Sequence, residues 1–115
     1  MKATDLMIKD WVNSQLDGHP IQIDEEVFYI LIKGYDDGIE PIPLTHEILE
    51  KNGWKETQYW HEYQDGKNTI QCCLPDMQGI INGIEIKEFQ CKYVHQYQHL
   101  LRLCGLDELA DNFKI

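Results

Sequence analysis

The hydrophobic pattern of the first forty residues predicts short β-strands. Ile21 and Ile23 alternate with polar residues, which is the period of a half-buried strand. The continuous run from Val27 to Lys33 is rich in β-branched and aromatic residues, which favours a more fully buried strand. A further strand is expected over 6–12. Short strands separated by glycine and aspartate turns are typical of a strongly twisted, SH3-like small barrel.

The next part of the chain predicts a helix followed by a β-meander. Two prolines make the segment Glu40–Leu44 extended, so it is the expected internal boundary. Thr45 is a helix N-cap, and Gly53 is placed to end a short helix over Thr45–Asn52. The expected meander strands cover 59–63 and 68–74. A third strand at Ile80–Ile81, and as an alternative a fourth over 84–86, are expected around a turn at Asn82–Gly83.

A closing amphipathic helix is predicted from Cys91 to Cys104, where apolar residues recur at helical spacing and Gly105 follows as a stop. Cys104 falls on the apolar face and is expected to be an inert core thiol. The fold class predicted is therefore α+β. A chain of 115 residues fits a single domain over 1–115, with a β-rich, SH3-like part over 1–40 and a helix–meander–helix part over 41–115.

The charge balance limits the partners that the chain can have. Twenty acidic and ten basic side chains give a net charge of −10. This field repels phosphate backbones and anionic lipids, so we expect no direct nucleic-acid binding and no membrane association. The same field would let the protein imitate nucleic acid toward a DNA-binding protein. No apolar run suits a signal peptide or a membrane span, so we expect a cytoplasmic protein with reduced cysteines.

Two histidines of the closing helix are the candidate metal ligands. His95 and His99 lie one helical turn apart, the spacing that lets two imidazoles share an ion. Cys91 precedes them by another turn, but it lies about 12 Å from His99 along the helix axis, too far for one ion. Gln96 stands where a metalloprotease would carry its glutamate base. The alternative is a polar helix face without a metal, and we predict no resident metal, no other cofactor and no catalytic residue.

An aromatic group marks the start of the meander and is the candidate interaction surface. A dense aromatic strand is either buried between a sheet and a helix or exposed as a binding patch, and both alternatives stay open here. Its members are Trp54, Tyr59, Trp60 and Tyr63.

Three segments carry a resemblance to a known family. They are the opening Met1–Leu6 with Asp10–Val12, the central Glu40–Thr45 with Glu47–Gly53, and the closing Lys92–His95 with Gln98–His99 and Leu101–Gly105. They resemble a family of small proteins of unknown function from gut Bacteroidales and their phages and mobile elements. The family commonly has glycine just before Asp10, where this chain has Lys9, which argues against a tight turn there. The resemblance implies a phage or mobile-element context and no particular activity.

We therefore expect a non-catalytic protein-interaction or structural module rather than an enzyme. Its expected partner is a protein, and self-association through exposed strand edges is a further possibility. The alternatives are an acidic inhibitor that mimics nucleic acid and a metal-assisted enzyme using His95 and His99.

Overall fold

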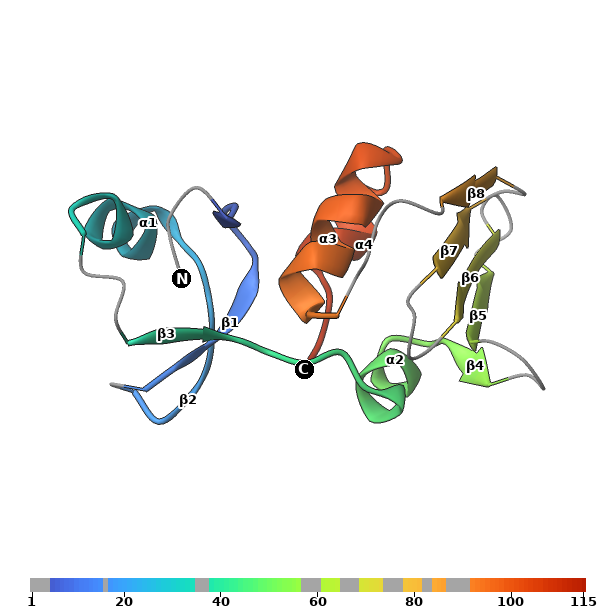
Figure 1. Ribbon diagram of the computed structural model, residues 1–115, viewed down its shortest axis with the longest axis horizontal. Coiled ribbons are helices and arrows are strands. Elements are labelled where there is room, and N and C mark those ends of the chain that lie inside the picture. The colour runs from blue at the N-terminus through green and yellow to red at the C-terminus, as the bar shows by residue number, and fades with distance from the viewer. Residues whose placement is uncertain are drawn as a thin grey trace. The chain divides into compact units, whose positions relative to one another are not determined.

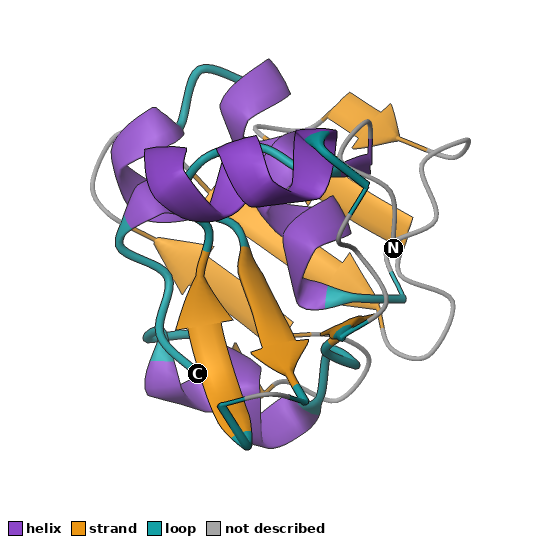
Figure 2. Cartoon of the chain, turned by 90° about the vertical axis from the view of Figure 1, so that its left-hand side faces the viewer, coloured by secondary structure: helices purple, strands orange, loops and turns teal. Residues whose placement is uncertain are grey.

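The computed structural model describes residues 5–15, 17–34, 38–56, 61–64, 69–73, 78–81, 84–86 and 92–115. The protein is α+β, with helices and antiparallel sheets (Figures 1 and 2). Two compact units are present. The first unit is Met1–Pro43 with Tyr93–Asn112, and the second unit is Leu44–Lys92 with Phe113–Ile115. None of the helices in the described ranges is long and apolar enough to cross a membrane.

The first unit contains a three-stranded antiparallel sheet in the order β2-β1-β3. Its strands are β1 (Trp11–Ser14), β2 (His19–Gln22) and β3 (Ile39–Pro41). Val12 on the central strand is fully buried and belongs to a core cluster with Leu6, Ile23 and Leu31. The described strands form an open sheet, so the SH3-like barrel stays a prediction.

The strand predicted over Val27–Lys33 is wrong, because this segment is the helix α1 (Glu25–Ile32). Asp24 is its N-cap, and the side chain accepts a hydrogen bond from the Val27 N–H at 2.8 Å. Two glutamates follow in the first turn, where they interact favourably with the helix dipole. This N-terminal signal outweighs the β-propensity of the apolar run.

A tight turn joins the start of the chain to β1, although no glycine occupies it. Lys9 adopts a φ of 77°, in the left-handed region that favours glycine. The turn is closed by a hydrogen bond from the Asp10 N–H to the Met7 carbonyl at 3.1 Å. The Lys9 N–H also donates to the Ile23 carbonyl at 2.6 Å. The expectation against a tight turn at this point is therefore not met.

Substituting Lys9→Gly is expected to stabilise the chain by about 0.5–1 kcal/mol, because glycine removes the steric cost of the left-handed conformation. Urea denaturation of both forms measures the difference. The matched control is Lys51→Gly at the end of a helix, where glycine is expected to destabilise by a similar amount. An equal loss of stability in both variants would contradict the strain assigned to Lys9.

Two helices complete the first unit, α3 (Val94–Leu103) and α4 (Asp107–Asp111). The end of α3 is the predicted one: Gly105 has a φ of 79°, and the Leu106 N–H donates to the Leu101 carbonyl at 2.9 Å. The apolar face of α3 is buried, as its spacing predicts. Cys104 differs from expectation, because this C-cap residue is exposed rather than in the core. Its partial burial raises the pKa of the thiol, which disfavours a reactive thiolate.

The second unit contains a short helix and a five-stranded antiparallel sheet in the order β4-β5-β6-β7-β8. The helix α2 (His46–Lys51) confirms the prediction, with Thr45 as N-cap and a φ of 88° at Gly53. The sheet confirms the meander and adds one strand that was not predicted, β4. The strands are β4 (Lys55–Glu56), β5 (His61–Gln64), β6 (Thr69–Cys73), β7 (Gln78–Ile81) and β8 (Ile84–Ile86).

Candidate functional site

A pocket of about 420 Å³ lies in the first unit, between the N-terminal segment and the first turns of α3. Its apolar part includes Leu6, Met7 and Pro41. Its polar lining comes from Asp5, Tyr93, His95, Gln96 and His99. The pocket therefore brings together the two histidines that helical spacing had singled out.

A buried carboxylate beside the pocket holds one of these histidines. Asp10 is fully buried, and its Oδ2 lies 2.5 Å from Nε2 of His99. Its Oδ1 accepts a hydrogen bond from Nη1 of Arg102 at 2.6 Å, and the Met7 N–H donates to Oδ2 at 2.7 Å. Because the carboxylate accepts, the His99 Nε2 carries the proton in this hydrogen bond. The Nδ1 atom of His99 takes no part in this hydrogen bond.

A second buried side chain fixes α3 against the same N-terminal turn. Gln98 is fully buried. Its Oε1 accepts from the Trp11 N–H at 2.9 Å, and its Nε2 donates to the carbonyls of Lys9 and Ala110, each at 3.0 Å. All three polar functions of the amide are used, which suits a side chain with no access to water.

His95 is the most enclosed polar group of the pocket lining. It is 6% exposed, and its Nδ1 is buried without a hydrogen-bond partner among the described residues. Its ring lies 6.0 Å from that of Tyr93 in a stacked arrangement and 5.7 Å from that of His99. Burial lowers the pKa of His95, which the charges of Asp10 and Asp5 oppose and that of His99 reinforces. The imidazole is therefore neutral at pH 7 and can offer a nitrogen lone pair.

The sequence predicted His95 and His99 but missed Asp10 and Gln98. Within the described ranges, no group of three His, Cys, Asp or Glu side chains is arranged to hold a metal ion. The signal that could have pointed to Asp10 is Arg102, the only arginine of the chain, on the polar edge of an amphipathic helix. A long-range contact of this kind cannot be read from spacing.

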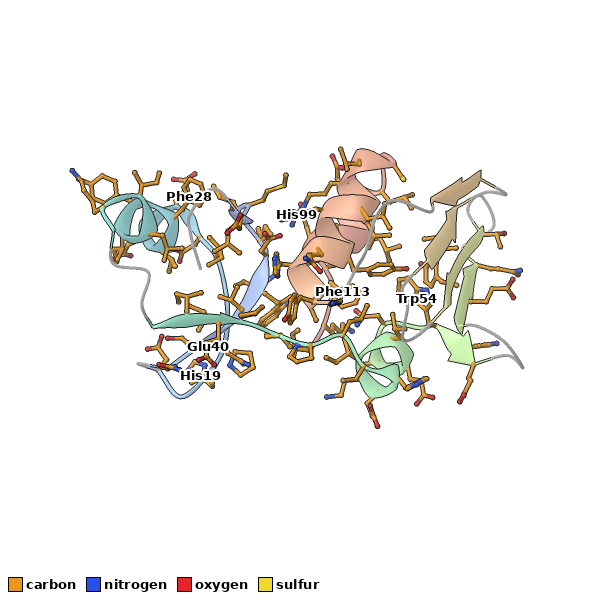
Figure 3. The ribbon with its side chains drawn as sticks, in the orientation of Figure 1. His19, Phe28, Glu40, Trp54, His99 and Phe113 are labelled. Carbon is orange, nitrogen blue, oxygen red and sulfur yellow. The ribbon has the colours of Figure 1, made fainter. Side chains whose placement is uncertain are left out.

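The structure describes two of the four residues of the aromatic group, Trp54 and Tyr63. Trp54 is 2% exposed and packs against Tyr63, with ring centres 4.7 Å apart, and against Phe113 at 6.1 Å (Figure 3). Trp54 is therefore part of a core, and Tyr63 is half-buried beside it. Tyr59 and Trp60 lie outside the described residues.

A different apolar surface, which the sequence analysis did not identify, lies on α1. Val27, Phe28 and Leu31 pack toward the core cluster of the first unit. Large apolar side chains also cover the outer face of this helix: Tyr29 is 60% exposed, Ile30 44% and Ile32 61%. We call these three residues the α1 outer face. The signal that could have found it is the Asp24 N-cap with two glutamates after it, which predicts a helix, followed by apolar residues on every side.

Comparison with known protein families, with curated proteins and with solved structures gives no match to this chain. The family resemblance of its three segments therefore stays a prediction. The pocket and the α1 outer face are the features from which a function can be inferred.

Proposed function

We propose that this chain is a non-catalytic protein-interaction module and that the α1 outer face is the surface that meets its protein partner. The observation that supports the proposal is the exposure of Tyr29, Ile30 and Ile32 on one short helix. Single exposed apolar residues are ordinary on protein surfaces, whereas contiguous ones are typical of interaction sites.

The pattern of α1 supports the proposal that a partner covers the outer face. A helix that is apolar on all sides is normally buried on all sides. Here one side is covered by the core cluster, while the outer face remains in contact with water. Covering three half-exposed side chains of this size would contribute roughly 1 kcal/mol or more for each.

The charges around α1 favour a partner with an apolar groove and a basic rim. Asp24, Glu25 and Glu26 surround the start of the helix, and Lys33 at its end is the one basic residue of the segment 24–33. Lys33 lies over the Tyr29 ring, with Nζ 5.2 Å from the ring centre. A second copy of the chain would bring a further charge of −10 and the same acidic helix start, so self-association is disfavoured.

The proposal includes a cytoplasmic setting in a phage or mobile element and an SH3-like character of the β-rich part. The resemblance of the three segments supports the setting, and the open antiparallel sheet β2-β1-β3 is consistent with the SH3-like character. An acidic inhibitor that mimics nucleic acid is the alternative, and it rests on net charge alone. An apolar outer face suits a protein groove better than a site built for phosphates.

Photocrosslinking tests the proposal. The full chain carries p-benzoylphenylalanine at position 29 in one form and at the exposed position 19 in another, and each is irradiated in a lysate of its host. We expect one protein to be crosslinked from position 29 and not from position 19, through a segment of apolar and basic residues.

Point variants then connect the crosslink with the outer face. Ile32→Asp is expected to weaken binding of the purified partner at least about tenfold and to change the chain's own stability little, since the residue is exposed. The matched control is Leu103→Asp, at an apolar residue on another helix that is 72% exposed, against 61% for Ile32, and it should leave binding unchanged. The proposal is contradicted if position 29 crosslinks only to a second copy of the chain, or if positions 29 and 19 crosslink equally. It is also contradicted if Ile32→Asp and Leu103→Asp weaken partner binding equally.

A further inference from the structure

We infer that the pocket of the first unit binds a divalent transition-metal ion, with Zn²⁺ as the representative, through one imidazole nitrogen each of His95 and His99. The site is independent of the α1 outer face and does not rest on the function proposed for it. Imidazole is the ligand that zinc, copper and nickel share, and the two rings lie on successive turns of one helix.

The separation of the two rings suits a shared ion. Zinc binds about 2.0–2.1 Å from an imidazole nitrogen, which puts the ion roughly 3 Å from the ring centre and two rings on one ion about 5–6 Å apart. The ring centres of His95 and His99 are 5.7 Å apart, with an angle of 77° between the planes. Both residues line the same pocket.

The hydrogen bond of His99 is the one that metal-binding histidines usually make. Such histidines donate their second ring nitrogen to a carboxylate or a carbonyl, which fixes the ring and makes the ligating nitrogen more basic. Asp10 provides this carboxylate, 2.5 Å from Nε2 of His99, and is itself held by Arg102 and by the Met7 N–H. The orientation of His99 is thus set before any ion arrives.

His95 provides an independent observation that points to a ligand in the pocket. A buried ring nitrogen without a partner is costly, because it has given up its hydrogen bonds to water. The Nδ1 atom of His95 is such a nitrogen within the described part of the chain, in a side chain that is only 6% exposed. Coordination of an ion at this ring would compensate for that loss. The carboxylate of Asp5, also in the pocket lining, adds negative charge that attracts a cation.

A site with two protein ligands is an open metal site rather than a structural one. Structural zinc sites are closed by four protein ligands, whereas sites with open positions keep water there. The described residues provide no third ligand already in place. The ion is therefore exchangeable, its remaining positions are taken by water, and it binds less tightly than a structural zinc.

Calorimetric titration of the full chain, made without a histidine tag and stripped with EDTA, tests the site with Zn²⁺ alone. We expect one equivalent to bind, and His95→Gln and His99→Gln each to abolish that binding. The matched control is the double variant His19→Gln/His46→Gln, which removes two exposed histidines and should bind as the wild type does.

NMR of the imidazole nitrogens in the wild-type chain gives a second reading that does not depend on variants folding. Zn²⁺ is expected to shift the ring resonances of His95 and His99 and to leave those of His19 and His46 in place. The inference is overturned by an affinity weaker than about 1 mM, by one-equivalent binding that survives both single substitutions, or by binding lost only in the control.

Discussion

Replacing Arg102 with methionine is expected to lower the free energy of unfolding by about 3–5 kcal/mol, because it leaves the Asp10 carboxylate buried without its charge partner. Asp10 has no exposed surface, so in the folded protein the carboxylate depends on its protein partners rather than on water. Methionine retains most of the aliphatic stem, so the loss reports the charge pair more than the packing. Urea denaturation followed by tryptophan fluorescence measures it.

A second carboxylate on the same arginine provides the control. Nη2 of Arg102 lies 3.2 Å from Oδ1 of Asp111, whose side chain is 42% exposed. Asp111→Asn is expected to cost about 1 kcal/mol or less. At about 1 M salt, where charges are screened beyond about 3 Å, the exposed pair should lose its effect and the buried pair should keep most of it. Similar losses from both variants, or a loss from Arg102→Met that disappears in salt, would show that Asp10 does not depend on its partner.

Local signals in the sequence predicted the ends of two helices correctly. Thr45 and Gly53 define α2, and Gly105 ends α3, because caps act over three or four residues that are adjacent in the chain. The meander was predicted for a similar reason, since each strand pairs with the next one along the chain. The strand predicted over Val27–Lys33 was wrong because β-propensity was given more weight than the Asp24 cap.

The candidate site was predicted only as far as helical spacing reaches. His95 and His99 share a pocket, as residues one turn apart on a helix face can. Asp10, the carboxylate partner of His99, lies 89 residues away from it in sequence, and no periodicity relates such positions. The exposure of the α1 outer face could not be predicted either, because an apolar pattern does not tell which of its sides the rest of the chain covers.

The stability of the first unit and the geometry of its pocket depend on the same contacts. Lys9 makes the turn that places Asp10, and Asp10 holds both Arg102 and His99. Any change that loosens this turn should therefore move His99 as well as lower stability. In contrast, the α1 outer face takes no part in these contacts, so its substitutions should leave metal binding unaffected.

Gln98→Ala is expected to lower the free energy of unfolding by about 3–5 kcal/mol. The loss combines the cost of the cavity that the shorter side chain leaves and the cost of the lost hydrogen bonds. Gln98 joins α3 to the Trp11 N–H and to the carbonyls of Lys9 and Ala110, without any contact with water. The two carbonyls accept other hydrogen bonds in the wild type, from Gln22 and from the Asn112 N–H. The Trp11 N–H loses its Gln98 acceptor, and its hydrogen exchange should become faster.

Two further variants separate the causes. Gln98→Met keeps most of the volume and removes the hydrogen bonds, so it should cost about 1–3 kcal/mol, less than the alanine variant. Gln15→Ala makes the same chemical change at an exposed glutamine bonded to Glu40 and should change stability by about 0.5 kcal/mol or less. Urea denaturation gives the three values, and hydrogen exchange at Trp11 identifies the bond that is lost. If Gln98→Met were as stable as the wild type and Trp11 exchanged no faster, the amide would be filling space only, and the polar contacts of α3 with the turn would be those that Arg102 and His99 make with Asp10.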